Sequence, residues 1–272
     1  MILPRSCARC GTDVNNDRHP TRVVAAILPR YPKCVSKVFL TAEWRNLVML
    51  NYEVDAGVLR RFVPDGTYLD VWQGRTFVSL VGFRFLNTKV FGLSFPFHSN
   101  FEEVNLRFYV QRRTGQELRR GVVFIREIVP RWAIARIARV FYNEKYLSLP
   151  MSHRIDRSSE ASITTEYCWR FGGCSNRICI HASGAPTLPE PASHEQFIAE
   201  HHWGYTAQPD GGCMEYRVGH PPWRVWKAHH AAFEGNIDGL YGAEFATVFS
   251  KKPSSAFLAE GSQVVVYRGS RL

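Results

Sequence analysis

The chain alternates short apolar segments with polar turns, and this pattern predicts a mainly β fold. Five segments rich in aromatic and β-branched residues are typical of strands: 77–86, 104–111, 121–129, 163–170 and 264–267. Thr114 and Gly115 form a turn signal between the second and third of these segments, which predicts a hairpin. No internal repeat is visible, so a repeat architecture is not expected.

Three further segments favour helices. Pro130 opens one of them, because proline is accepted in a first helical turn, and apolar residues recur at helical spacing over 134–141. Ser193 and Gln196 form a capping-box pattern in front of the second. A third, shorter helix is expected after Asn236. The sequence therefore predicts a mainly β (α+β) fold with a few covering helices.

Charged residues interrupt the apolar segment 121–129. Regular alternation of side chains between the two faces of a strand places Arg126 with Val122, Phe124 and Ile128. The opposite face then carries Glu127 with Val123, Ile125 and Val129. Both faces are otherwise apolar, as in a strand that is buried on two sides. An isolated buried charge costs several kcal/mol, so Arg126 and Glu127 are each expected to have a partner.

The segment 101–111 has one apolar face and one polar face. The apolar face, expected to be core, carries Val104, Leu106, Phe108 and Val110. The polar face carries Glu103, Asn105, Arg107, Tyr109 and Gln111. Two interpretations of the polar face stay open. It either meets solvent outside the sheet or lines an internal pocket with Glu and Arg groups.

The first 37 residues differ from the rest of the chain. They carry seven basic and two acidic residues, which is half of the net charge of +10. They also hold four prolines and little apolar patterning, so we expect a flexible basic extension over 1–37 and a single domain over 38–272. Elsewhere the basic residues are scattered, which argues against a nucleic-acid partner.

Neither a membrane nor an oxidising compartment is expected. The longest apolar runs, 23–28 and 46–52, fall far short of the ~20 residues that cross a bilayer. The 7 cysteines are odd in number and spread along the chain, which argues against a disulfide framework and favours the cytoplasm.

No motif for a metal or a cofactor is evident. Cys7 and Cys10 have the spacing of half a zinc site, but no fitting second half follows. Adjacent histidines such as His201 and His202 point in different directions and do not easily chelate one ion. His98, just before the polar face described above, is a candidate base near the mouth of a pocket.

Several segments resemble the YqjF-like family, the domain of unknown function 2071. The resemblance extends from Phe39 to Leu272 nearly without gaps and rests on residues 39–55, 79–83, 100–109, 121–130, 142–146, 202–205, 257–262 and 266–269. This family is similar in fold to acetoacetate decarboxylase. The resemblance therefore implies a bacterial protein with a cone-like, antiparallel β-barrel and helices packed outside it.

In decarboxylases of this type a lysine forms a Schiff base with a β-keto acid, and a dry pocket beside another cation keeps its amine neutral. For this chain, only the resemblance implies such a Schiff-base lysine. The resemblance places Lys145 near the nucleophile and Glu103 near a pocket glutamate. Two departures weaken it: Glu144 and Tyr146 flank Lys145, and Glu53 stands where an arginine is expected.

Three hypotheses follow. The first is a barrel that binds a small polar or carboxylated molecule in a pocket lined by Glu103, Arg107, Arg126 and Glu127, with His98 and Tyr146 at its rim. The second is an enzyme of the decarboxylase or lyase type that uses Lys145 together with Glu103. The third is a scaffold whose internal ion pairs are structural. None of these needs a cofactor, and the oligomeric state stays open.

Overall fold

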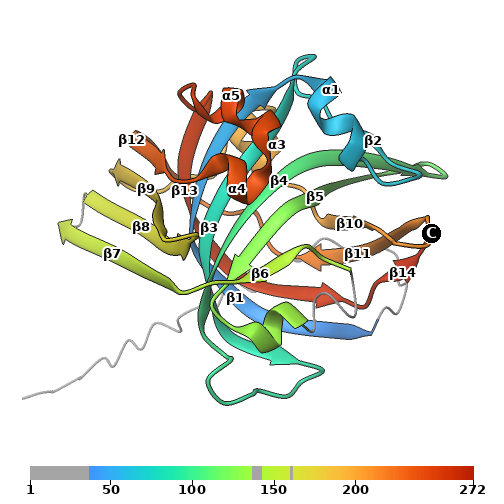
Figure 1. Cartoon of the computed structure of the whole chain (residues 1–272), viewed down its shortest axis with the longest axis horizontal. Coiled ribbons are helices and arrows are strands. Elements are labelled where there is room, and N and C mark those ends of the chain that lie inside the picture. The colour runs from blue at the N-terminus through green and yellow to red at the C-terminus, as the bar shows by residue number, and fades with distance from the viewer. Residues whose placement is uncertain (1–36, 137–142, 160–161) are drawn as a thin grey trace, which may run out of the picture. The chain divides into compact units, whose positions relative to one another are not determined.

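The computed structural model describes residues 37–136, 143–159 and 162–272 (Figure 1). The long strands of the N-terminal half are β1 (Val38–Val54), β3 (Thr76–Val90), β4 (Phe101–Thr114) and β5 (Glu117–Val129). The long strands that follow are β7 (Met151–Ser159), β8 (Ser162–Phe171), β9 (Cys174–Ser183), β12 (Val225–Glu234) and β13 (Ser255–Tyr267). The shorter strands are β2 (Tyr68–Leu69), β6 (Tyr146–Ser148), β10 (Trp203–Ala207), β11 (Cys213–Gly219) and β14 (Ser270–Arg271).

Short helices connect and cover these strands. They are α1 (Ala56–Leu59), η1 (Arg60–Phe62), α3 (His194–Ala199), α4 (Ile237–Tyr241), η2 (Ala243–Phe245) and α5 (Ala246–Phe249), together with a helical turn over residues 132–136. The predicted mainly β fold with few helices is therefore confirmed. None of the helices in the described ranges is both long and apolar enough to cross a membrane.

The strands pair in the order β14-β11-β10-β5-β4-β3-β1-β13-β12-β9-β8-β7. β11 also pairs with β13, through Val218 opposite Val266 and Gly219 opposite Val265. The pairing path from β11 through β10, β5, β4, β3, β1 and β13 therefore returns to β11. Figure 1 shows β7, β8, β9 and β12 gathered on one side of these strands. The predicted hairpin between β4 and β5 is confirmed, with Gly115 at a φ of 60°.

The long strands β1, β3, β4 and β5 bury both faces along their central parts, and each face belongs to a different apolar cluster. Val104, Leu106 and Phe108 of β4 belong to a cluster that includes side chains of β8, β9 and α5. Phe77, Val81, Phe83 and Phe85 of β3 belong to a second cluster, which includes Phe197 and Ile198 of α3. This two-sided burial explains why the strands are apolar throughout.

A β-bulge in β5 changes the faces that regular alternation predicts. Leu106 pairs with Arg126, but the next residue, Arg107, pairs with Phe124, so Ile125 is an extra residue in β5. Phe124 and Glu127 consequently face the same side, although they are an odd number of positions apart. The sequence-based grouping of Phe124 with Arg126 was wrong, because alternation does not anticipate a bulge. The predicted separation of Arg126 from Glu127 is confirmed.

The predicted helix starts agree with the structure where it describes them. Ser193 caps α3, accepting a hydrogen bond from the Gln196 amide at 3.2 Å. The Gln196 side chain accepts from the Ala192 amide at 2.6 Å, one residue earlier than a capping box requires. Asn236 caps α4 in the same manner, accepting from Gly239. The predicted extension of the helix after Pro130 to residue 141 lies partly outside the described residues. Residues 1–36, with Cys7 and Cys10, lie wholly outside them.

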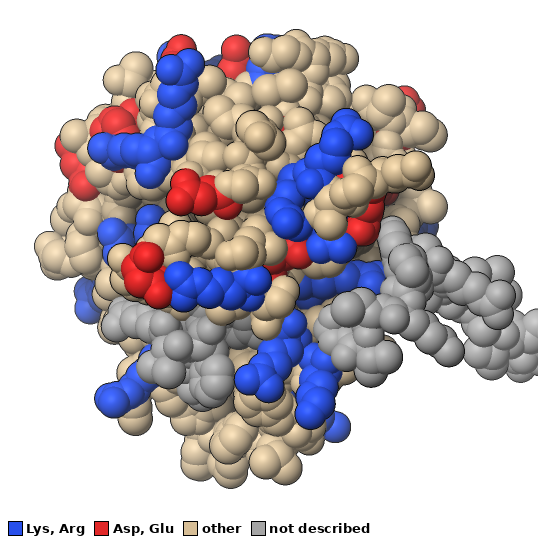
Figure 2. Space-filling view, turned by 90° about the vertical axis from the view of Figure 1, so that its right-hand side faces the viewer, with Lys and Arg blue, Asp and Glu red and all other residues tan. Residues whose placement is uncertain are grey.

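Basic and acidic side chains are interspersed on the face of the molecule drawn in Figure 2. Several of the arginines form ion pairs with neighbouring carboxylates, such as Arg119 with Glu215 and Arg271 with Asp210. Much of the positive charge on the described domain is therefore locally compensated.

Candidate functional site

A cavity of about 130 Å³ lies on the side of β3, β4 and β5 that faces α3. Most of its wall is apolar and includes Trp44, Phe83, Phe101, Trp203 and Trp223. Its polar lining consists of Glu103, Asn105, Arg107, Glu127, Glu144, Tyr146, His201, Tyr216 and His220. A mostly apolar pocket with a few convergent polar groups is the usual form of a small-molecule site.

β4 supplies the central polar residues of this cavity. Glu103, Asn105 and Arg107 alternate along the strand with Val104 and Leu106, so all three point to the cavity side. The Asn105 amide donates to Glu103 Oε1 at 2.9 Å. Of the two interpretations of this polar face, the structure shows the inward one. The solvent-facing interpretation was wrong, because Phe197 of α3 and His201 pack against Tyr109 on this side of β4.

Two other segments bring carboxyl groups to the same place. The bulge turns Glu127 of β5 into the cavity, and Glu127 stands opposite Asn105 in the sheet. β6 pairs with the end of β5, which sets Tyr146 beside Glu127. The Tyr146 hydroxyl donates to Glu103 Oε2 at 3.0 Å. Glu144 precedes β6 and accepts hydrogen bonds from Thr206 at 2.6 Å and Tyr216 at 2.8 Å.

These three glutamates are buried, and burial changes their acidity. Burial raises the pKa of Glu103 to about 7, against the hydrogen bonds from Asn105 and Tyr146 that favour the carboxylate. Burial likewise raises the pKa of Glu144 to about 7. Burial and the nearby charges of Glu144 and Glu103 hold the pKa of Glu127 well above its ordinary value. Carboxyl groups with such pKa values can both give and take protons near neutral pH.

Arg107 supplies the permanent positive charge of the polar lining. It is only 8% exposed, yet its guanidinium forms no ion pair or hydrogen bond within the described ranges, and its Nε is buried without an acceptor. The guanidinium carbon lies 5.8 Å from the centre of the Tyr109 ring. Buried arginines normally have carboxylate partners, so a guanidinium in this state is suited to an external anion.

Two neutral histidines complete the polar lining. The Nε2 of His201 bonds to Asp70 at 3.0 Å, and Asp70 also accepts from Arg120 at 2.7 Å. Burial lowers the pKa of His201 to about 4, against the effect of Asp70. Neutral His201 therefore donates from Nε2 to Asp70, and its Nδ1, which has no hydrogen-bond partner, is an acceptor.

His220 is fixed in the opposite tautomer. Its Nδ1 lies 2.9 Å from the carbonyl oxygen of Pro221, which can only accept, so Nδ1 carries the proton and Nε2 is an acceptor. Burial lowers the pKa of His220 to about 3. The ring stacks on Trp223, with ring centres 4.1 Å apart.

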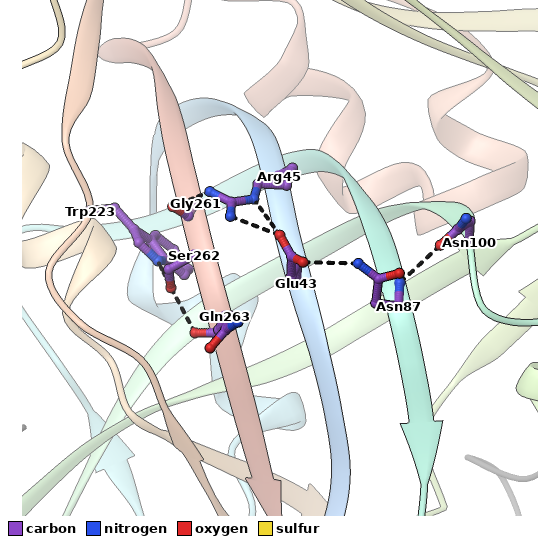
Figure 3. Close-up of polar contacts among 8 residues, drawn as sticks. All are labelled: Glu43, Arg45, Asn87, Asn100, Trp223, Gly261, Ser262 and Gln263. Atoms are coloured by element: carbon purple, nitrogen blue, oxygen red, sulfur yellow. Dashed lines mark hydrogen bonds and ion pairs between the residues drawn. The ribbon is translucent and has the colours of Figure 1, made fainter. Parts of the chain in front are cut away.

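Trp223 is in turn held by β13. Its indole donates to the Ser262 hydroxyl at 2.9 Å, and that hydroxyl donates to the carbonyl of Gln263 (Figure 3). A second chain of polar contacts joins β1 to β3: it runs from Arg45 through Glu43, both on β1, to Asn87 on β3. These contacts fix the strands that carry the aromatic wall of the cavity.

Buried polar atoms without a partner are concentrated at this cavity. They include the donors Trp44 Nε1 and Arg107 Nε and the acceptors Asn105 Oδ1, Glu127 Oε2 and His201 Nδ1, all on residues that line it. Such atoms are rare in folded proteins, and each needs an explanation such as a bound molecule or ordered water. Their concentration here indicates a site for a polar ligand.

The structure brings together four of the predicted site residues and leaves three outside. Glu103, Arg107, Glu127 and Tyr146 line the cavity. Three others are not among its lining residues. His98 bonds to the carbonyl of Pro96, Arg126 donates to the carbonyl of Leu240, and Lys145 is exposed with its amine 5.2 Å from the Phe62 ring centre.

Sequence reasoning missed Glu144, His201, His220 and Tyr216. The signal for Glu144 was present, because a glutamate stood beside the lysine that the resemblance singled out. His201 and His220 follow α3 and β11, and no local pattern indicates that those ends approach β4. Within the described ranges, no three His, Cys, Asp or Glu side chains converge in the manner of metal ligands.

Residues 41–263 match the DUF2071 family, which is described as a family of uncharacterised conserved proteins. The chain belongs to this family. One DUF2071 relative is the uncharacterised protein YqjF of Bacillus subtilis, which is 24% identical over 204 residues, 73% of this chain and 80% of that protein. The family resemblance seen in the sequence is thereby confirmed.

Solved structures similar to this DUF2071 protein share its fold at low identity. The acetoacetate decarboxylase of Legionella pneumophila has a TM-score of 0.62 and 12% identity, with 92% of this chain and 93% of that chain covered. The enduracididine biosynthesis enzyme MppR, complexed with pyruvate, has a TM-score of 0.60 and 12% identity, covering 88% and 92%. At these identities the likeness establishes the acetoacetate-decarboxylase-like fold alone.

Proposed function

We propose that this protein binds a small carboxylic acid in the cavity, with the ligand carboxylate paired to Arg107. The observation that carries the proposal is the buried guanidinium of Arg107, which has no carboxylate partner among the described residues. Desolvating a cation without compensation is costly, and a guanidinium offers a planar fork that matches a carboxylate.

The rest of the lining supports a ligand with further features. Aromatic rings make up much of the wall, so an apolar portion of the ligand would be buried against Trp44, Phe83 and Phe101. The unpartnered acceptors Asn105 Oδ1 and His201 Nδ1 would accept from a hydroxyl group or from an ordered water. A small hydroxy or oxo acid with a short apolar tail meets all three requirements.

The fold relatives support a site at this place. We interpret the pairing path that returns to β11 as the cone-like barrel expected from the family resemblance, with the cavity inside it. MppR, a protein of similar fold, has been solved in complex with pyruvate, which is a small oxo acid.

The second candidate function is Schiff-base chemistry at Lys145. One observation favours it: partial desolvation of the amine and the nearby charge of Arg126 lower the pKa of Lys145, as a nucleophilic amine requires. Its exposed position outside the cavity favours the binding function instead. Incubation with acetoacetate and borohydride, followed by intact mass measurement, distinguishes the two. A reduced adduct mapped to Lys145 would favour the enzyme.

The binding proposal is tested by thermal melting with a set of small acids. Suitable probes are pyruvate, 2-oxobutanoate, lactate and 3-methyl-2-oxobutanoate, each beside its neutral amide. A ligand at a hundred times its Kd stabilises the fold by about 2.7 kcal/mol, which gives a clear rise in Tm. We expect acids, but not amides, to raise the Tm of the wild-type protein.

Two variants locate the effect. Arg107→Met should lose the acid-dependent rise in Tm, whereas Arg84→Met, on the neighbouring strand β3 and away from the cavity, should keep it. If no acid raises the Tm, or if Arg107→Met keeps the response, the binding proposal fails and a purely structural role for the buried charges becomes the better account.

A further inference from the structure

Glu127 and Glu144 form a pair of carboxyl groups whose two members differ in how they are held. The geometry points to this pair as an acid–base catalyst that removes and returns the proton on the carbon next to the carbonyl group of a bound 2-oxo acid. The inference rests on the proposed function, because the ligand carboxylate must first be held by Arg107.

Both side chains line the same cavity, and each perturbs the pKa of the other. Neighbouring buried carboxylates resist ionising together, so the pair shares at least one proton. Glu144 is fixed by the hydroxyls of Thr206 at 2.6 Å and Tyr216 at 2.8 Å. Glu127, by contrast, has one buried oxygen, Oε2, without a partner in a cavity that it lines. One member is thus anchored, and the other presents a free oxygen.

The charged groups around the pair come from several elements. β4 contributes Glu103 and Arg107, β6 contributes Tyr146, and β11 contributes Tyr216. Lys145 lies next to Glu144 in the chain and interacts with it through space. Burial raises the pKa of Glu144 to about 7, so the pair changes protonation near neutral pH, where an acid–base catalyst is most effective.

The other candidate bases of the cavity are less suitable. Glu103 has a pKa raised to about 7, but both of its oxygens already accept hydrogen bonds, from Asn105 and Tyr146. No lysine is among the described residues that line it. The pKa of His201 is lowered by burial to about 4 and that of His220 to about 3, so their free nitrogens bind protons less strongly than the carboxyl pair. The donors Arg107 Nε and Trp44 Nε1 have no acceptor and can bind the oxygens of an anion.

The step balances without any other reactant. The bond between carbon and hydrogen breaks, and the proton passes to Glu127 Oε2 while the shared proton stays between the two carboxyl groups. The electron pair of that bond forms a carbon–carbon double bond, and the carbonyl electrons move onto oxygen to give an enolate. Reversal returns a proton from Glu127 to carbon. In heavy water the returned nucleus is deuterium.

Proton NMR in D2O tests this inference with pyruvate and 2-oxobutanoate as probes. We expect the protein to speed the loss of the signal from the protons next to the carbonyl group, relative to buffer. Glu127→Gln should lower the exchange rate by about 100-fold or to the buffer rate, and Glu144→Gln should also lower it. Both variants should retain the rise in Tm with the same acids. Glu102→Gln, on β4 but paired with His153 outside the cavity, should exchange like the wild type.

The outcomes separate the inference from the proposed function. Binding without faster exchange, or exchange that Glu127→Gln and Glu144→Gln leave unchanged, overturns the catalytic pair and leaves the binding site standing. No rise in Tm with any acid overturns the proposed function and this inference together. If Glu127→Gln does not fold, as judged by circular dichroism, the result for Glu144→Gln decides.

Discussion

Replacing Glu144 with glutamine tests whether the buried acids of the cavity set the pH dependence of stability. Glutamine has the shape of a protonated glutamate, and its side-chain oxygen can still accept from Thr206 and Tyr216. Its amide can donate toward Glu127, as the protonated carboxyl would. The variant therefore keeps the hydrogen bonds and removes only the ability to ionise.

The magnitude follows from the pKa of Glu144. Burial raises that pKa from 4.5 to about 7, and one pKa unit corresponds to about 1.4 kcal/mol. Ionising Glu144 in the fold above pH 7 therefore costs roughly 3 kcal/mol relative to the unfolded chain. The free energy of unfolding of most domains is about 5–15 kcal/mol, so this cost is a large part of it.

The sign is fixed by which state binds the proton. Between the unfolded pKa of 4.5 and the folded value of about 7, the folded protein binds more protons at Glu144 than the unfolded chain. The free energy of unfolding contributed by this group therefore falls as pH rises through that window, and it stays low above it. His201 acts in the opposite direction below its ordinary pKa of 6.5, because burial lowers its pKa to about 4.

Wild type and Glu144→Gln contain the same histidines. The difference between their free energies of unfolding at each pH therefore reports the ionisation of Glu144. Urea unfolding followed by tryptophan fluorescence gives the free energy of unfolding at each pH. As the pH rises from about 5 to about 9, we expect the free energy of unfolding of the variant to increase by roughly 3 kcal/mol relative to that of the wild type. Parallel curves for Glu144→Gln would refute the raised pKa of Glu144.

Two more predictions concern residues that lie against the cavity lining, next to Trp44 and His201. Gly261→Ala should lower the free energy of unfolding by about 3 kcal/mol or more, because its φ is 81° and a Cβ would lie 2.0 Å from the Trp44 carbonyl oxygen; urea unfolding measures it. Asp70→Asn should destabilise by about 1–3 kcal/mol at neutral pH, since the bonds from Arg120 and His201 no longer have an ionised acceptor. Burial opposes ionisation of Asp70, but these two partners hold its pKa below the ordinary value, so the loss should shrink in acid as the wild-type carboxyl becomes protonated.

The strands and the polar face of β4 could be predicted because they depend on local pattern. Alternation alone placed Glu103, Asn105 and Arg107 on one face, and the structure keeps them there. Whether that face was inside or outside could not be read from β4. Phe197 of α3 and His201, which pack on it, come roughly 80–100 residues later in the chain and approach it only in the fold.

The lysine beside β6 shows a second limit. The family resemblance indicated the right segment, but the turn at Asn143, with a φ of 56°, and the pairing of β6 with β5 decide which side chain faces the cavity. Glu144 and Tyr146 face it, and Lys145 does not. A single-position difference in facing cannot be derived from residue type, since lysine and glutamate both occur at pocket walls and on surfaces.

The extra residue in β5 has a consequence for how DUF2071 proteins should be compared. If Phe124 kept its position and Ile125 paired with Leu106 without a bulge, Arg126 would take the inward position and Glu127 would turn away. A chamber with three acids and one cation would become one with two of each. Homologues of equal strand length that pair this strand without the bulge are therefore expected to prefer different ligands, even where the aligned letters agree.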